Sequence, residues 1–365
     1  MATKTIISPD IEEWEGYTGR PFLISGPCSA ESEEQVMETA RQLAALNKVS
    51  IFRAGIWKPR THPDSFEGVG SEGLKWLRRV KQETGLLVGV EVANERHVLE
   101  ALKYGIDMLW IGARTTVNPF TVQEISNALQ GADVMVLVKN PINPDIDLWI
   151  GAFERIARAG IKRLGAIHRG FSAFEKTIYR NQPNWQLPIE LRRRIPDLPI
   201  ICDPSHIGGA RMYLHEISQK ALDLNFDGLI IESHIDPANA LSDSEQQITP
   251  NELNELLSRL ILRNPNTNNQ KLLDTLGELR QQIDVYDEHL LDLLEKRMKI
   301  SEKIGRYKKE NNITILQSLR WDEIMKRAIS KGAAKGISVE AINEIFKAIH
   351  QESINIQMKV MNEDE

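Results

Sequence analysis

The 365-residue chain is poor in cysteine and has no long apolar run. Its two cysteines, Cys28 and Cys202, each close an apolar stretch, which excludes the disulfide framework of a small secreted domain and leaves a metal ligand or a buried thiol. No apolar run approaches the roughly 20 residues that cross a bilayer, and the start, MATKTIISPDIEEWEG, lacks the pattern of a signal or transit peptide. We therefore expect a cytoplasmic protein with no membrane partner.

An excess of positive charge is also missing, since the net charge is −6. A protein that binds a nucleic-acid backbone normally has a basic surface, so no nucleic-acid partner is expected. Hydrophobic residues make up 41% of the chain and charged residues 26%, as in ordinary globular proteins. A (β/α)₈ barrel of about 250 residues would leave about a hundred residues over, which predicts two domains.

Eight short apolar runs recur in the first part of the chain, and helical patterns such as SEEQVMETARQLAAL lie between them. Near-continuous apolar strands that alternate with amphipathic helices indicate a parallel sheet covered by helices, and eight units predict a closed (β/α)₈ barrel. A doubly wound open sheet is the alternative, but no G-x-G-x-x-G turn follows the first run. The predicted strands are residues 22–28, 50–55, 86–92, 108–113, 134–139, 161–167, 198–203 and 228–233.

The pattern changes at RNPNTNNQ (263–270), a polar segment that predicts a linker. Apolar residues then recur at spacings of three and four over about forty residues, and two shorter helical segments follow at 320–331 and 338–360. The sequence thus predicts a barrel domain over 1–262 and a separate all-α domain over 271–365. Because one long helix cannot easily bury its apolar stripe against two shorter ones, we expect an intertwined homodimer through the helical domain.

Polar residues stand at the ends of the predicted strands, where the loops of a (β/α)₈ barrel build the active site. Each one alone is more often solvated or packed for structure, but their convergence predicts a site. The cations among them would repel one another unless they bind an anion, so a phosphorylated carboxylic acid is indicated. These cations are Arg53, Lys58, Arg60, Arg114, Lys139 and Arg169.

A second set at the strand ends has the side chains of metal ligands: Cys28, His206, Glu232 and Asp243. One thiolate, one imidazole and two carboxylates suit one divalent ion such as Mn²⁺, Fe²⁺, Co²⁺ or Zn²⁺ better than Mg²⁺ or Ca²⁺. Their spacing gives no support by itself, because the four residues come from separate strands.

Eight motifs of the first domain together resemble 3-deoxy-D-arabino-heptulosonate 7-phosphate (DAHP) synthase of the short microbial subfamily. They are GPCS (26–29), RAGIWKPRT (53–61), GAR (112–114), VLVKN (136–140), HRGFSAFEK (168–176), DPSHIGG (203–209), IIESH (230–234) and ALSDSEQQ (240–247). The resemblance implies a barrel that condenses phosphoenolpyruvate with erythrose 4-phosphate, using a divalent metal. The related octulosonate-phosphate synthases carry a K-A-N-R loop where this chain has K-P-R, and K-P-R favours the four-carbon aldose phosphate.

The resemblance also implies roles for individual residues. The four metal-ligand types above would hold the ion, and phosphoenolpyruvate would be bound by Arg53, Lys58, Arg114, Lys139 and Arg169. Arg60 and Thr61 would hold the phosphate of erythrose 4-phosphate, and Lys58 is the candidate proton donor to the new alkoxide. Two positions depart from the family pattern and put the positioning of water in question: His168, where Glu is expected, and Thr115-Thr116, where Asn is frequent.

Three basic residues of the helical domain have informative spacing. Arg297 and Lys308 lie three helical turns apart, so they share one face at roughly 16 Å. Arg280 precedes Arg297 by roughly 25 Å of helix, so a small ligand cannot touch all three residues in one chain. In an intertwined dimer, Arg280 of one protomer would reach the pocket of the other.

The second domain resembles the all-helical class of chorismate mutase in L-x-x-L-R-x-x-I-D-x-x-D (276–287), LLEKRMKISEKIGRYK (293–308) and ESINIQ (352–357). The resemblance implies substrate contacts by Arg280, Arg297, Lys308, Arg320, Ser353 and Gln357, with Arg297, Lys308 and Gln357 catalytic. The rearrangement of chorismate to prephenate needs no acid, base or nucleophile, so cations beside the ether oxygen account for such a pocket. Trp321 and Gln317 depart from the family, which often has Glu and Asp there.

Three interpretations of the helical domain stay open: a mutase, a sensor of chorismate or prephenate that regulates the barrel, and a dimerisation module. Four polar residues argue against a mere dimerisation module, because a scaffold does not need them. They are Arg280, Arg297, Lys308 and Gln357. Inhibition of the barrel reaction by prephenate is a hypothesis that the fusion motivates.

Overall fold

The computed structural model describes residues 6, 8–58, 65–172, 177–264, 266–316 and 318–363. The chain forms two compact units, Met1–Pro265 and Asn266–Glu365. None of the described helices combines the length and the apolar character that a membrane crossing needs.

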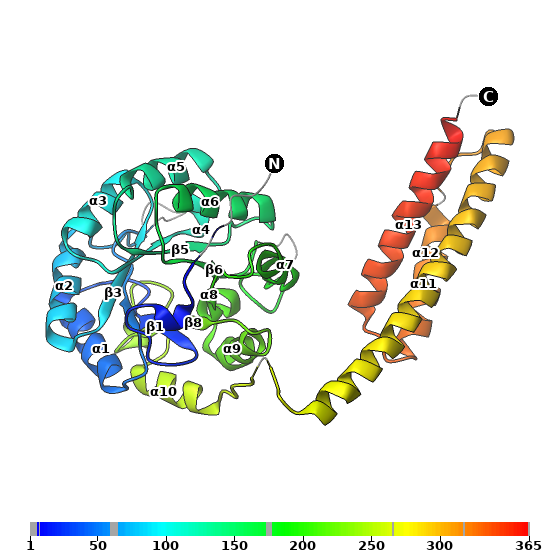
Figure 1. Cartoon of the computed structure of the whole chain (residues 1–365). Helices are drawn as coiled ribbons and strands as arrows, with labels where there is room; N and C mark the ends of the chain where they lie inside the picture. The colour runs from blue at the N-terminus through cyan, green and yellow to red at the C-terminus, as the bar shows by residue number, and fades with distance from the viewer. Residues whose placement is uncertain are drawn as a thin grey trace. The chain divides into compact units, whose positions relative to one another are not determined.

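The first unit is a closed barrel of eight parallel strands in chain order, with β8 pairing with β1 (Figure 1). This confirms the predicted (β/α)₈ barrel and rejects the open sheet. The strands are β1 (Phe22–Gly26), β2 (Ile51–Arg53), β3 (Leu87–Val92), β4 (Met108–Ile111), β5 (Met135–Lys139), β6 (Leu164–His168), β7 (Ile200–Cys202) and β8 (Gly228–Glu232).

Helices cover the outside of the barrel, and most begin at a residue whose side chain caps the first turn. Ser32, Asn94, Asn118 and Asp145 each accept a hydrogen bond from a backbone N–H of the helix they precede. The main helices are α1 (Glu33–Ala45), α2 (Glu72–Thr84), α3 (Glu95–Lys103), α5 (Pro119–Ala128), α6 (Ile146–Arg158), α7 (Gln186–Arg194), α9 (Leu214–Asp223) and α10 (Pro250–Arg259). Two short helices, α4 (Ala113–Thr116) and α8 (Pro204–Gly208), follow β4 and β7 directly.

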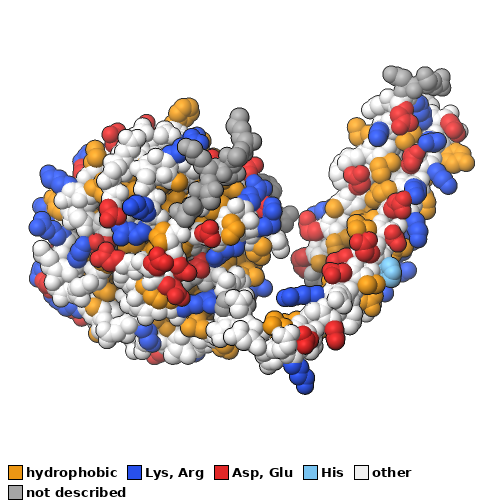
Figure 2. All heavy atoms as spheres, in the orientation of Figure 1, with side chains coloured by type: hydrophobic (Ala, Val, Ile, Leu, Met, Phe, Trp, Pro, Cys, Tyr) orange, Lys and Arg blue, Asp and Glu red, His pale blue; other side chains and the backbone are white. Residues whose placement is uncertain are grey.

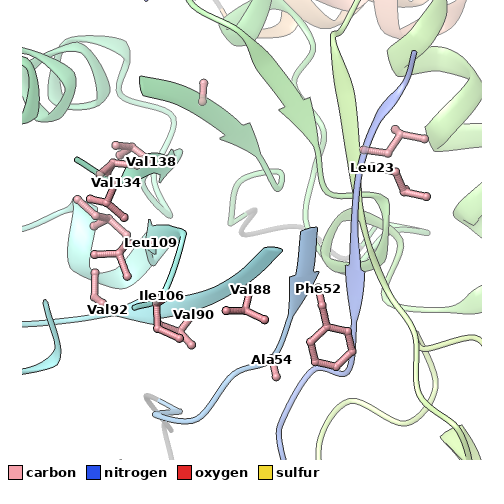
Figure 3. Packing of buried hydrophobic residues seen from close by; sticks show 14 of the residues in the cluster. Leu23, Phe52, Ala54, Val88, Val90, Val92, Ile106, Leu109, Val134 and Val138 are labelled. Carbon is pink, nitrogen blue, oxygen red and sulfur yellow. The ribbon is translucent and has the colours of Figure 1, made fainter. Parts of the chain in front are cut away.

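The strands are apolar on both faces, which gives the barrel two hydrophobic layers. The outer layer lies between strands and helices, and Figure 3 shows part of it, with Leu23, Phe52 and Val90 on three neighbouring strands. The inner layer fills the barrel and includes Trp14 from the N-terminal segment, whose ring packs edge-on against Phe22 at 5.9 Å. The interior is therefore a packed core, and polar side chains gather where the strands end.

The second unit contains three helices, as the sequence predicts: α11 (Gln270–Glu310), α12 (Ser318–Ala333) and α13 (Val339–Met361). Both α11 and α12 pack against α13 (Figure 1). Gly305 of α11 allows a close approach, because a Cβ there would lie 3.2 Å from Gln357 Cα. Many large apolar side chains of α11 are nevertheless exposed, and Figure 2 shows hydrophobic side chains interspersed with charged ones along this unit.

Candidate functional site

A polar pocket of about 480 Å³ opens at the carboxyl ends of the barrel strands. Its wall brings together residues that are distant in the sequence, because the parallel strands all end at this edge. The residues that line it are Lys58, Ser65, Glu91, Ala113, Arg114, Lys139, Ile142, Arg169, Ser172, Arg180, Asn181, His206 and Asp243.

Three of the four predicted metal ligands meet beside this pocket. One donor atom each of Cys28, Glu232 and Asp243 lies within 4.8 Å of the other two. The Cys28 thiol donates a hydrogen bond to Asp243 Oδ2 at 3.2 Å, and Lys58 Nζ donates to Cys28 Sγ at 3.0 Å. Gly26 permits this arrangement: its φ is +149°, and a Cβ there would lie 2.0 Å from the carbonyl oxygen of Arg53.

The fourth predicted ligand, His206, lies at the edge of this cluster. Its Nε2 is 3.7 Å from Glu232 Oε1, and its Nδ1 is 2.8 Å from Asp203 Oδ2. The Asp203 carboxylate favours the proton on Nδ1, so that the Nε2 lone pair is directed toward the cluster. Asp203 stands at a strand end in the sequence, but sequence reasoning gave it no role.

The donor set fits a divalent transition-metal ion. Cys28, Glu232 and Asp243 can supply one sulfur and two carboxylate oxygens, and His206 can supply one nitrogen. Burial, and then the nearby Glu232, raise the pKa of the Cys28 thiol to about 12. A bound cation would reverse this effect and leave a thiolate ligand.

Arg53 neutralises part of this negative charge from inside the barrel. Its side chain is only 1% exposed, and its Nη1 donates to Glu232 Oε1 at 3.1 Å. Its guanidinium also lies over the ring of Trp110, 4.9 Å from the centroid, while Trp110 Nε1 donates to Glu91 Oε2 at 2.8 Å. Arg53 is thus held by one carboxylate, one aromatic face and the carbonyl oxygen of Cys28.

The remaining predicted cations lie around the pocket. Lys139 Nζ donates to Asp203 Oδ2 at 3.1 Å, and Arg169 Nη1 donates to Asn181 Oδ1 at 2.7 Å. Burial, and neighbouring cations such as Arg180, lower the pKa of Arg169 to about 10. Together with Arg114, these groups form a cationic wall that suits an anionic ligand.

The structure leaves the predicted roles of Arg60 and Thr61 untested, and it places His168 away from the pocket. Arg60 and Thr61 lie outside the described residues. His168 is fully buried and packs against Phe171, Trp185 and Phe226 in the outer layer, so it does not line the pocket.

Thr116 belongs to the other departure from the family pattern. Its hydroxyl lies within hydrogen-bonding distance of two carbonyl oxygens, those of Gly112 and Lys139, and can donate to either. Sequence reasoning also missed Arg180 and Asn181, which line the pocket from the segment after β6. No local sequence pattern identifies these two residues as part of a site, because the side chains and carbonyl groups that they contact lie far away in the sequence.

The helical unit brings two of its predicted residues, Arg297 and Ser353, together. Arg297 Nη1 on α11 donates to Ser353 Oγ on α13. Gln357 is buried one turn further along α13, and its Nε2 donates to the carbonyl oxygen of Ser353 at 3.2 Å. Lys308 Nζ donates to the carbonyl oxygen of Ile315 at 2.5 Å. Ser353 and Gln357 therefore lie on the face of α13 that packs against α11, Ser353 opposite Arg297 and Gln357 opposite Gly305.

Arg280 and Arg320 do not join this group within one chain. Both are exposed; Arg280 lies seventeen residues before Arg297 on the same helix, and Arg320 donates to Glu323 at 2.8 Å. Trp321 stacks on His350 of α13, with ring centroids 4.0 Å apart. Gln317 lies outside the described residues.

Comparisons with known proteins give a family match for each unit of the chain. Residues 4–264 match the DAHP synthetase I family, and residues 279–358 match chorismate mutase type II. A phospho-2-dehydro-3-deoxyheptonate aldolase of Thermotoga maritima is 33% identical over 268 residues, which cover 73% of each chain. A 2-dehydro-3-deoxyphosphooctonate aldolase of Variovorax paradoxus is 29% identical over 263 residues, covering 66% of this chain and 89% of the relative.

A solved structure of the Thermotoga maritima aldolase, whose title calls it a DAHP synthase, is also similar, with a TM-score of 0.59 and 32% identity over 70% of each chain. Both matched families are enzymes, a transferase and an isomerase of the shikimate pathway. The chain therefore belongs to the DAHP synthetase I family and carries a chorismate mutase type II domain after its barrel.

Proposed function

We propose that the barrel condenses phosphoenolpyruvate with erythrose 4-phosphate and water to give DAHP and inorganic phosphate, and that it needs a divalent metal. The observation that carries this proposal is the cluster of Cys28, Glu232 and Asp243 within 4.8 Å, at the edge of a cationic pocket. A site with three potential ligands and four or more cations matches a metal-dependent reaction between two phosphate esters better than a purely structural role.

The residues of the pocket divide the chemistry between them. An ion held by Cys28, His206, Glu232 and Asp243 would polarise the aldehyde oxygen of erythrose 4-phosphate. Arg114, Lys139 and Arg169 would bind the carboxylate and phosphate of phosphoenolpyruvate, and Arg60 and Thr61 the phosphate of the aldose.

Lys58 is the proposed acid of the reaction. Its Nζ lies at the boundary between the donor cluster and the pocket, 3.0 Å from Cys28 Sγ. In that position, it can give a proton to the alkoxide that forms as the enol carbon attacks the aldehyde. Water then adds to the adjacent carbon, and phosphate leaves with cleavage of its C–O bond.

The two cysteines provide a matched test of this proposal, because both are fully buried at strand ends. We expect Cys28→Ser to lose bound metal and the consumption of phosphoenolpyruvate, whereas Cys202→Ser, in the outer layer, keeps both. Phosphoenolpyruvate is followed by its ultraviolet absorbance, and metal content by elemental analysis. A Cys28→Ser protein with full metal content and full rate would refute the metal site.

We further propose that the helical unit rearranges chorismate to prephenate. Arg297 of α11 already meets Ser353 of α13, and Gln357 follows one turn further along the same face of α13; this arrangement supports a pocket for a small dicarboxylate. Arg297 and Lys308 would stabilise the negative charge that develops on the ether oxygen as its bond breaks. Arg297→Lys should lose most of the chorismate turnover, because one ammonium cannot replace the fork of a guanidinium. Exposed Arg306, which pairs with Glu302, is the control position for the same substitution.

An intertwined homodimer would complete this pocket. Five apolar side chains at alternating spacings of four and three form an exposed stripe on α11: Leu279, Ile283, Tyr286, Leu290 and Leu293. Such a stripe is typical of a helix that packs against another helix. A second copy of α11 would cover it and bring Arg280 of the partner into the pocket.

Complementation tests this arrangement directly. Arg280→Ala and Arg297→Ala should each abolish chorismate turnover, and refolding an equimolar mixture should restore about a quarter of the wild-type rate, because half of the dimers are mixed and each has one intact site. No recovery in a mixture shown to contain mixed dimers would refute the shared pocket.

A sensor of chorismate or prephenate is the second candidate function of the helical unit. One observation favours it: Trp321 stands at a position where a carboxylate is expected, and it stacks on His350. Prephenate would then inhibit the barrel reaction. Unchanged consumption of phosphoenolpyruvate at saturating prephenate would refute sensing, and inert chorismate would refute catalysis.

A further inference from the structure

Each of the three potential metal ligands beside the pocket, the Cys28 thiol and the carboxylates of Glu232 and Asp243, has a basic partner from this same chain. Lys58 Nζ donates to Cys28 Sγ at 3.0 Å, Arg53 Nη1 to Glu232 Oε1 at 3.1 Å, and Arg180 Nη1 to Asp243 Oδ1 at 2.9 Å. The three cations differ in accessibility. The Arg53 side chain is 1% exposed and fixed on several sides, whereas that of Arg180 is 48% exposed and lines the pocket.

The backbone of Arg180 is fixed, although its guanidinium is accessible. Phe171 and Gln182 exchange two backbone hydrogen bonds, and Arg180 N donates to the carbonyl oxygen of Gly208 at 3.3 Å. Gly209 makes room for this approach, because its φ is +69° and a Cβ there would lie 2.5 Å from Arg180 Cβ. The segment thus places a flexible basic side chain at one defined point on the pocket wall.

Arg180 competes with a cation for the Asp243 carboxylate. One Asp243 oxygen accepts from Arg180, and the other accepts from the Cys28 thiol. Arg180 Nη1 also donates to Gln246 Oε1 at 2.8 Å, and Gln246 Nε2 donates to Glu232 Oε2 at 2.6 Å. An ion that binds Asp243 would therefore weaken the charge pairing that holds Arg180 there.

A guanidinium released from Asp243 would stay within the pocket. Arg169 and Asn181 line the same wall, and Asn181 is next to Arg180 in the chain. A phosphate group has three oxygens that can accept the paired N–H groups of arginine, so it is the chemical group most suited to take Arg180 from the carboxylate.

We propose that Arg180 is a further substrate-binding residue of the barrel: it pairs with Asp243 in the metal-free protein and binds a substrate phosphate once a metal occupies the site. This inference rests on the proposed metal and phosphate chemistry of the barrel. Metal and phosphate ester then bind cooperatively, because each favours the state in which Arg180 has left Asp243, and the coupling is reciprocal.

The test compares Arg180→Met with Arg211→Met in the full chain. Arg211 supports the same loop, but through the carbonyl oxygens of Gln247 and Ser244, and no carboxylate among the described residues pairs with it. Titration calorimetry measures the affinity for Mn²⁺ without substrate, and then the affinity of the Mn²⁺-loaded protein for phosphoenolpyruvate and, separately, for erythrose 4-phosphate.

We expect Arg180→Met to bind Mn²⁺ more tightly than wild type by roughly tenfold and to bind one of the two esters more weakly by a similar factor. The ester that loses affinity identifies the phosphate that Arg180 receives. Arg180→Lys should retain part of the coupling, since it keeps the charge. Arg211→Met should not increase the affinity for Mn²⁺.

Weaker Mn²⁺ binding by Arg180→Met, as for a residue that merely supports the loop, would overturn the inference. Unchanged affinity for both esters would also overturn it, while leaving the proposed metal site intact. Failure of the wild-type protein to bind Mn²⁺ or any other first-row divalent ion would instead contradict the proposed function itself.

Discussion

Asp203→Asn is the substitution that most sharply tests how His206 is prepared for metal binding. Asp203 is fully buried; its Oδ2 lies 2.8 Å from His206 Nδ1 and 3.1 Å from Lys139 Nζ, and its Oδ1 accepts from the backbone N–H of His206. Burial opposes its charge, but His206 and Lys139 outweigh burial and lower the pKa of Asp203. An asparagine can still cap α8 through its side-chain oxygen, but its second atom is then an NH2 group, which can accept from neither His206 nor Lys139.

Loss of such a partner behind a metal-ligating histidine typically weakens metal binding by about 10- to 100-fold. That factor corresponds to about 1.4 to 2.7 kcal/mol. We therefore expect Asp203→Asn to bind Mn²⁺ that much more weakly in a calorimetric titration, with an unchanged circular dichroism spectrum.

The control is Asp227→Asn, which removes a carboxylate paired with Arg192 at the start of β8, the opposite end of the strand from Glu232. It should leave the affinity for Mn²⁺ unchanged. Wild-type affinity in Asp203→Asn would show that His206 needs no orientation by Asp203, and the reasoning would be wrong.

Three further substitutions probe separate parts of the chain. His97→Ala removes the ring that stacks on Trp57 at 3.9 Å, next to Lys58, and should lower kcat/KM for phosphoenolpyruvate by roughly threefold to tenfold, whereas His97→Phe keeps the rate. Burial, and then Arg169, lower the pKa of His168 to about 3, so the folded protein keeps it neutral while the unfolded chain protonates it below about pH 6.5. The free energy of unfolding of wild type relative to His168→Leu should therefore fall by about 2 kcal/mol from pH 7 to pH 5 in urea titrations, and a constant difference would contradict the burial argument. Leu290→Glu places a charge on the exposed stripe of α11 and should yield monomers in sedimentation, with chorismate turnover lost and phosphoenolpyruvate consumption retained; Glu302→Gln is the control.

The sequence was sufficient to predict the barrel, because its strands are short apolar runs separated by helical patterns. Only a parallel sheet covered by helices explains that alternation. The sequence was insufficient to predict the layer in which the His168 side chain lies. Alternation along β6 places Ile167 in the inner layer and His168 in the outer layer, but a strand that is apolar on both faces hides that alternation in the sequence.

Strand-end residues such as Cys28 and Glu232 were predictable, because the topology of a parallel barrel forces them to one edge. Arg180 was not, since it comes from an irregular segment and its partner Asp243 lies 63 residues further along the chain. Arg280 shows another limit: its distance from Arg297 follows from helix geometry, but its role depends on a second protomer.

We propose that one chain carries a metal-dependent condensation and a metal-independent rearrangement. The most direct test of this proposal follows phosphoenolpyruvate and chorismate in parallel with the same intact protein, before and after chelation and after Mn²⁺ is restored. We predict that chelation abolishes the consumption of phosphoenolpyruvate reversibly and leaves chorismate turnover unchanged. Condensation at the full rate in metal-free protein would contradict the proposed metal dependence of the barrel, and inert chorismate in every sample would contradict the proposed mutase activity of the helical unit.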